Sequence, residues 1–144
     1  MWFWLSLLAA FLWGIDYALT GQVLKKLSLL TLLSVELFFG FLVTLLITVF
    51  TGIWKQDFGI LFSSKILMVL VFIIMICFAT ANIMITASIQ EKGASIASII
   101  EISYPFFVAL VTWIIFKERS FNVATVAGGL LIFVGVIMIY LSNR

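Results

Sequence analysis

Three carboxylates lie inside long apolar stretches of this sequence, where no lysine or arginine accompanies them. They are Asp16, Glu36 and Glu101. An ionisable side chain at the centre of a lipid bilayer is unfavourable by several kcal/mol and therefore marks a candidate functional site. Without a cationic partner, the three acids must either hold protons or complete their site with a cation from outside. The alternative is that they hydrogen-bond neighbouring helices and serve packing alone.

Aromatic residues and a proline accompany two of these acids at helical spacing. Trp13 precedes Asp16 by three residues, and Tyr104 follows Glu101 by three. Each aromatic ring can therefore share a helix face with its acid, and aromatic faces near carboxylates favour organic cations. Pro105 leaves the carbonyl of Glu101 without its helical N–H partner, which predicts a kink and a free carbonyl beside the carboxylate.

The three acids also share one depth if the apolar stretches are membrane-spanning helices. With a rise of about 1.5 Å per residue, each lies roughly 5–6 Å from the midplane, displaced toward the same face. Asn82 falls at a similar level, and like Thr80 and Thr86 it can either bind a ligand or hydrogen-bond between helices. Gly40 opens space one turn after Glu36. Polar groups from four helices thus predict a pocket for a cation.

Composition indicates which secondary-structure elements carry these polar side chains. Hydrophobic residues make up 65% of the 144 residues and charged residues 10%, whereas soluble domains carry about 25% charged residues. The apolar runs are unbroken rather than alternating, so they predict helices and not the strands of a barrel. We expect an all-α integral membrane protein with one domain over residues 1–144, a bundle of five transmembrane helices in the cell (cytoplasmic or inner) membrane. The expected spans are about 2–24, 29–50, 66–88, 94–116 and 121–141.

Composition also argues against several kinds of chemistry. The chain has no histidine and a single cysteine, Cys77. It therefore lacks the commonest general base and metal ligand, and it cannot form a disulfide within the chain. The formal net charge of +2 is too small to indicate a nucleic-acid partner. We expect no metal, no cofactor and no enzymatic activity.

The connections between the spans carry most of the charges. The longest connection, residues 51–65, contains an apolar stretch that we expect in the membrane interface: Phe58, Ile60, Leu61 and Phe62. The face that holds the N-terminus, side A, carries Lys55, Lys65, Lys117 and Arg119. The opposite face, side B, carries Lys25, Lys26, Lys92 and Arg144. Because orientation follows the Lys/Arg difference between the faces, this balance permits insertion in both orientations. The alternatives are a parallel dimer and a fixed orientation set by Lys25 and Lys26.

Small residues recur along the last expected span. Ala124, Gly128 and Gly135 follow a heptad-like spacing, and Gly129 adjoins Gly128. Small residues so spaced let a second helix approach closely. They predict either a dimer contact or packing within one chain.

The order of several motifs resembles the EamA family of the drug/metabolite transporter superfamily, over nearly the whole chain. The motifs are Trp13-Gly14, the run from Gly93 to Ser98, Pro105, Glu118-Arg119, and Gly128-Gly129 with Gly135. The resemblance implies two inverted five-helix repeats in typical members, which move small metabolites, whereas this chain holds one repeat. In that respect it is similar to the small multidrug resistance proteins, which work as antiparallel dimers. Asp16 resembles their coupling acid in location only.

The chain departs from many members of the family at three positions. It has Ile15-Asp16 where many have Ser-Asn, Glu36 where many have arginine, and Tyr104 where many have glutamate. Its acid near the proline is instead Glu101. A site more acidic than usual favours a cationic or zwitterionic substrate over an anionic one.

The resemblance implies a small-molecule transporter that works by alternating access in a dimer and is coupled to protons. Its expected partners are the lipid bilayer, a small-molecule substrate, protons, and either a second copy in antiparallel orientation or a paralogous half. The expected residues are Asp16, Glu101, Glu36, Trp13, Tyr104 and Asn82 for substrate and protons, Pro105 and Gly14 as hinges, and Ala124, Gly128, Gly129 and Gly135 for dimer contact or packing. Two alternatives stay open: a subunit of a lipid-linked sugar flippase, and a non-transporting subunit that packs against a membrane partner.

Overall fold

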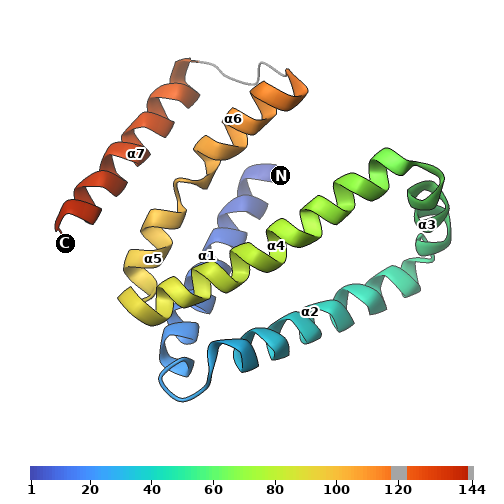
Figure 1. The fold of residues 1–144 in the computed structure, drawn as a ribbon, viewed down its shortest axis with the longest axis horizontal. Coiled ribbons are helices and arrows are strands. Elements are labelled where there is room, and N and C mark those ends of the chain that lie inside the picture. The colour runs from blue at the N-terminus through green and yellow to red at the C-terminus, as the bar shows by residue number, and fades with distance from the viewer. Residues whose placement is uncertain (118–122, 143–144) are drawn as a thin grey trace.

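The computed structural model describes residues 1–117 and 123–142, which form helices joined by short turns (Figure 1). The helices in these ranges are α1 (Trp2–Val23), α2 (Leu29–Thr51), α3 (Trp54–Ser63), α4 (Lys65–Lys92), α5 (Ala94–Glu101), α6 (Tyr104–Phe116) and α7 (Val123–Ser142). The expected start of the last span at residue 121, and the charged residues Glu118, Arg119 and Arg144, lie outside the described residues.

Four stretches in the described part of the chain are long and apolar enough to cross a bilayer. They are α1, α2, α4 and the stretch Ala94–Phe116 that α5 and α6 share. The described apolar part of α7, Val126–Ser142, is shorter. The chain is therefore an all-helical, multi-pass membrane protein, and its expected fifth span stays a prediction.

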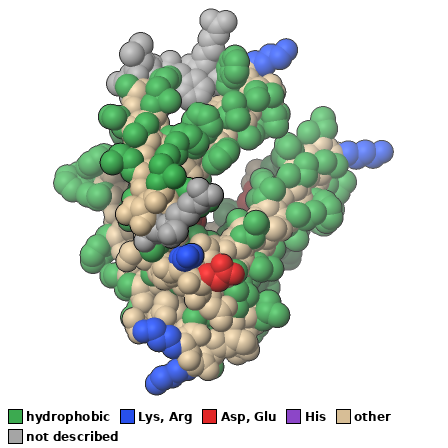
Figure 2. Space-filling model, turned by 60° about the vertical axis from the view of Figure 1, so that its left-hand side comes forward, with side chains coloured by type: hydrophobic (Ala, Val, Ile, Leu, Met, Phe, Trp, Pro, Cys, Tyr) green, Lys and Arg blue, Asp and Glu red, His purple; other side chains and the backbone are tan. Residues whose placement is uncertain are grey.

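The surface of the protein is suited to lipid rather than water. Figure 2 shows hydrophobic side chains covering most of one face, with few charged side chains among them. The residues of α1 from Trp2 to Ile15 are all exposed, including large aromatic side chains. Exposed apolar patches of this extent mark a membrane or protein contact.

The connection between α2 and α4 is itself a helix, which the sequence analysis anticipated only as an interfacial stretch. Trp54, Phe58 and Phe62 recur every four residues along α3, and successive rings lie 6.4 Å and 6.0 Å apart between centroids. Side chains four residues apart share one face of a helix. The aromatic stripe therefore gives this 10-residue helix an apolar side, although it is too short to span a membrane.

Capping residues set the ends of several helices. The Ser28 hydroxyl accepts the Thr31 N–H at the start of α2, and the Ser64 hydroxyl accepts the Leu67 N–H at the start of α4. Gly93 alone separates α4 from α5, and its φ of +86° and ψ of 156° lie in a region that side chains rarely allow. The sharp turn between these helices therefore depends on glycine.

The expected kink at Pro105 is a complete break of the helix. The first part, α5, ends at Glu101, and α6 begins at Tyr104. Between them the chain tightens into short turns, since Ser103 N–H donates to the Ile100 carbonyl at 3.2 Å and Phe106 N–H donates to the Ser103 carbonyl at 3.0 Å. Pro105 cannot donate to the Glu101 carbonyl, so the regular helical ladder stops at this point.

The buried core lies at side B, where the end of α1 meets the start of α2, the end of α4 and the start of α5. Its buried apolar residues are Leu24, Leu32, Leu33, Ile89 and Ala97. Gly21 permits close approach there, because a Cβ at this position would lie 3.6 Å from Ala94 Cβ and 3.7 Å from Ile89 Cγ2. Figure 1 shows α6 and α7 side by side on one side of the molecule, with α2 and α4 on the other, linked through α3. Packing at side B leaves room between the helices toward side A.

Candidate functional site

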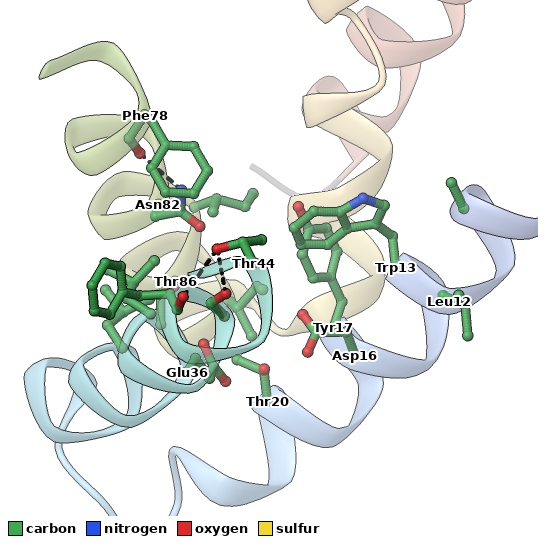
Figure 3. Close-up of a pocket in the computed structure, with 17 residues that line it drawn as sticks. Leu12, Trp13, Asp16, Tyr17, Thr20, Glu36, Thr44, Phe78, Asn82 and Thr86 are labelled. Carbon is green, nitrogen blue, oxygen red and sulfur yellow. Dashed lines mark hydrogen bonds between the residues drawn. The ribbon is translucent and has the colours of Figure 1, made fainter. Parts of the chain in front are cut away.

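A cleft of about 900 Å³ opens next to this core, between α1, α2 and α4 (Figure 3). Its polar lining combines two carboxylates, three hydroxyls, a phenol and an amide: Asp16, Glu36, Thr20, Thr44, Thr86, Tyr17 and Asn82. Leu33 and Ile89, which belong to the core or pack beside it, line the end at side B. The cleft is therefore closed by packed side chains toward side B.

Two carboxylates from different helices face this cleft. Asp16 comes from α1 and Glu36 from α2, and both point into the space between them (Figure 3). None of the described residues that line the cleft is a lysine or arginine. Two like charges in a low-dielectric site, without a protein cation, favour the binding of protons or of a cationic ligand.

The amide and one hydroxyl of the cleft donate to the backbone of their own helices. Asn82 Nδ2 donates to the Phe78 carbonyl at 2.8 Å. Thr44 Oγ1 lies 2.9 Å from the Gly40 carbonyl and 3.1 Å from the Phe41 carbonyl, and donates to them. The sequence left open whether Asn82 bonds between helices, and the structure shows a bond within α4. The Oδ1 of Asn82 remains available as an acceptor.

Aromatic side chains of α1 form one wall of the cleft, and one of them hydrogen-bonds to α5. The rings of Trp13 and Tyr17 lie 5.6 Å apart between centroids, tilted by 59°. The Tyr17 hydroxyl donates to Glu101 Oε2 at 2.7 Å. Glu101 is the last residue of α5, so this hydrogen bond joins the aromatic wall to the break before α6.

Comparison with known proteins places this arrangement in a family. A family model described as the EamA-like transporter family matches residues 1–141. The chain belongs to the EamA-like transporter family. This membership places it in the drug/metabolite transporter superfamily and makes it a transporter of that general type, because members of the family are transporters rather than enzymes. Comparison with curated proteins and with solved structures gave no significant match.

The fold of this EamA-like chain brings four of the expected binding residues to one cleft. They are Asp16, Glu36, Trp13 and Asn82, and Gly40 lines the cleft with them. Glu101 does not line it and reaches it only through Tyr17. Tyr104 is 60% exposed and also lies outside the cleft, because the break after α5 separates it from the helix turn that carries Glu101.

The expected hinges have different local structures. Pro105 stands in the first turn of α6, directly after the break. Gly14 lies within α1, which continues through it, and an added Cβ would meet no atom within 4 Å. The helix is therefore interrupted next to Pro105 and continuous at Gly14, and the hinge roles of both residues stay predictions.

Tyr17, Thr20 and Thr44 also line the cleft but were not predicted from the sequence, whereas Thr86 was considered together with Asn82. Spacing was the available signal: Thr20 follows Asp16 by four residues, and Thr86 follows Asn82 by four. Thr44 stands two turns after Glu36, and Tyr17 one turn after Trp13. Polar residues at such intervals lie on the same helix face. Each residue predicted for the site could therefore have indicated the next polar residue on that face.

A second, apolar groove of about 450 Å³ lies between α6 and α7. Gly128 and Gly129 line it, together with Pro105 and Trp113. The rings of Phe106 and Phe133 lie 5.7 Å apart where the two helices pack. Gly135 does not line this groove, and the side chain of Ala124 is outside the described residues. The glycines thus border an apolar surface, as expected for a helix contact.

No group of three or more acidic, cysteine or histidine side chains in the described ranges could hold a metal ion. Two carboxylates alone are a poor site for a hard divalent cation, which prefers six or more oxygen ligands. The cleft is better suited to organic cations, because aromatic and apolar side chains surround its acids.

Proposed function

We propose that this EamA-like protein is a proton-coupled transporter of a small organic cation or zwitterion. The observation that carries the proposal is the pairing of Asp16 and Glu36 in a membrane cleft whose described lining holds no cation. The Trp13 ring borders the same cleft and can bind the apolar or cationic part of the substrate.

Coupling follows if protons and substrate compete for the same carboxylates. An empty cleft with two ionised acids is unfavourable in a low-dielectric surrounding, so Asp16 and Glu36 take up protons. A bound cation stabilises the ionised acids and displaces those protons. The transporter then exchanges protons for substrate, because either protons or a bound cation can neutralise the two carboxylates within the membrane.

Alternating access requires that the cleft be closed toward one face of the membrane in one state and toward the other face in the next state. The core at side B closes this state, whereas α1 is unpacked toward side A. The break at Ile102 and Ser103 lets α5 move relative to α6, and the Tyr17–Glu101 hydrogen bond links that motion to the wall of the cleft. Hinges of a few residues at element ends are a common means of such closure.

We propose further that the working unit is an antiparallel homodimer in the cytoplasmic (inner) membrane, with a paralogous half as the alternative partner. A chain with an odd number of spans places its termini on opposite faces, and transporters commonly combine inverted repeats around one pathway. The balance of Lys and Arg between the two faces supports insertion both ways. The groove between α6 and α7 is a contact surface for the partner.

Binding calorimetry with benzylguanidine tests the proton step. This probe is an aromatic cation that keeps its charge at neutral pH, as guanidinium groups do. The purified protein in nanodiscs should bind it with a heat that changes with the ionisation enthalpy of the buffer, because a proton leaves the acid that pairs with the cation. Equal heats in all buffers would show that binding releases no protons and would exclude the coupling.

A further inference from the structure

We propose that the cleft between α1, α2 and α4 selects a diamine, a ligand with two N–H-bearing ammonium groups joined by an apolar chain. The inference rests on the proposed function and names its substrate class. It depends on charge, on the hydrogen-bonding groups left free in the cleft, and on the apolar lining between the acids.

The first argument is charge balance. Asp16 and Glu36 approach the cleft from separate helices, so each can bind its own ammonium group (Figure 3). A monocation would pair with one acid and leave the other protonated, and a zwitterion would add a further negative group. A diamine matches both acids, and an ionised acid with a cationic partner is far less unfavourable within the membrane.

The second argument is the number of acceptor oxygens. Asn82 and Thr44 each donate to a backbone carbonyl of their own helix, and the Tyr17 hydroxyl donates to Glu101. The Oδ1 of Asn82 remains as an acceptor, in addition to the four oxygens of the two carboxylates. These acceptors favour a ligand with several N–H donors, which a quaternary ammonium group lacks.

The third argument comes from the deepest part of the cleft. Thr20 and Thr86 are only 6% and 4% exposed, and both line the cleft. Within the described residues no hydrogen bond joins either side-chain hydroxyl to another group, and no fully enclosed polar atom lacks a partner, so these oxygens open into the cleft. Such hydroxyls are suited to accept the remaining N–H bonds of an ammonium group held by Asp16 or Glu36.

The fourth argument is the surface between the polar groups. Leu37, Phe41, Phe78 and Ile85 line the same cleft. They offer an apolar path for the methylene chain of a diamine, and burial of that chain favours binding. An inorganic or very small cation would leave this surface unused.

Four probes of similar length separate the ligand classes by binding to the purified protein in nanodiscs. They are hexamethylenediamine, hexylamine, aminocaproate and hexamethonium, which carry two ammonium groups, one ammonium group, a zwitterion and two quaternary groups. We expect hexamethylenediamine to bind at least about tenfold more tightly than each of the others, because it is the only probe that offers each of the two acids an ammonium group with N–H donors. In Glu36→Gln the diamine should lose this advantage over hexylamine, whereas Asp57→Asn, an acid of α3 outside the cleft, should keep it.

The outcomes distinguish this inference from the proposed function. Equal binding of the diamine and hexylamine, or tighter binding of aminocaproate or hexamethonium, overturns the diamine inference. If none of the four probes binds while benzylguanidine does, the inference is wrong and cation transport stands. If benzylguanidine also fails to bind, the proposed function falls too. Should Glu36→Gln not fold, the order of the four probes on the native protein decides the matter, and Thr86→Val should weaken the diamine more than hexamethonium.

Discussion

The Tyr17 hydroxyl donates a 2.7 Å hydrogen bond to Glu101 Oε2, and this bond joins α1 to the end of α5. Tyr17 lines the cleft, whereas Glu101 stands at the break that precedes Pro105. One side chain therefore touches both the candidate binding site and the end of α5 at the helix break. Ligand binding beside Tyr17 and movement at the break are expected to influence each other through this contact.

Replacement of Tyr17 by phenylalanine keeps the ring against Trp13 and removes only the hydrogen bond. We expect Tyr17→Phe to lower the free energy of unfolding by roughly 0.6–2 kcal/mol, the range for hydrogen bonds between membrane helices. Binding of benzylguanidine should also weaken. Unfolding in mixed detergent and binding calorimetry measure the two effects. Tyr140→Phe in α7 is the matched control, and an equal loss there would show that the Tyr17–Glu101 bond has no special role.

Replacement of Pro105 by alanine should restore a helical N–H for the Glu101 carbonyl. We expect Pro105→Ala to join α5 to α6, to leave folding intact and to reduce transport, because the break is the bending point. Circular dichroism would report the gain in helix, and uptake by proteoliposomes would report transport. Full uptake by this variant would mean that the break is incidental to function.

Gly93 allows a test of the turn between α4 and α5. Its φ of +86° and ψ of 156° are strained for any residue with a Cβ, so Gly93→Ala should destabilise the fold by about 1–3 kcal/mol. Gly59→Ala is the control, because Gly59 is helical, has no neighbour within 4 Å of an added Cβ, and should be stabilised by up to about 1 kcal/mol. Equal unfolding free energies for Gly93→Ala and the native protein would contradict the assigned turn.

Hydropathy was sufficient to predict the helical, membrane-spanning class, because lipid leaves few structures that pair all backbone groups. It was not sufficient for α3, whose 10 residues are too few to give a spanning signal. The prediction of a kink at Pro105 came from the missing N–H, but the extent of the break did not. The number of residues over which helical hydrogen bonding is interrupted depends on the turns at Ser103 and Phe106. Sequence spacing does not specify these turns.

Residues of the candidate site could be predicted where they follow a spacing along one helix. Side-chain contacts between two different helices could not be predicted. Asp16, Trp13 and Asn82 were proposed from depth and spacing, and they line one cleft. Tyr104 was paired with Glu101 because it follows by three residues, whereas the observed partner is Tyr17, 84 residues away. That pairing depends on the packing of α1 against α5, which no local pattern in the sequence encodes.

Dual topology can be tested with a single cysteine. In a Cys77→Ser background with a cysteine added after Arg144, an impermeant reagent should label about half of the molecules in intact cells, since orientation follows the loop charge difference. Labelling of all molecules, or of none, would exclude insertion in both orientations.

A matched pair of biased variants then tests the antiparallel dimer. Two lysines inserted after Lys26 should fix one orientation and abolish transport, and two inserted after Gly52 should fix the other. Co-expression of these variants should restore transport. If either variant transports alone, the antiparallel arrangement is not required.

Uptake of benzylguanidine into proteoliposomes tests the central claim, that the acids of the cleft exchange protons for an organic cation. Native protein should drive accumulation when the vesicle interior is more acidic than the medium, and little when the two sides have equal pH. Asp16→Asn should reduce this gradient-driven uptake to the level of protein-free vesicles, whereas Asp57→Asn should leave it unchanged. Accumulation by Asp16→Asn equal to that of the native protein would contradict the account.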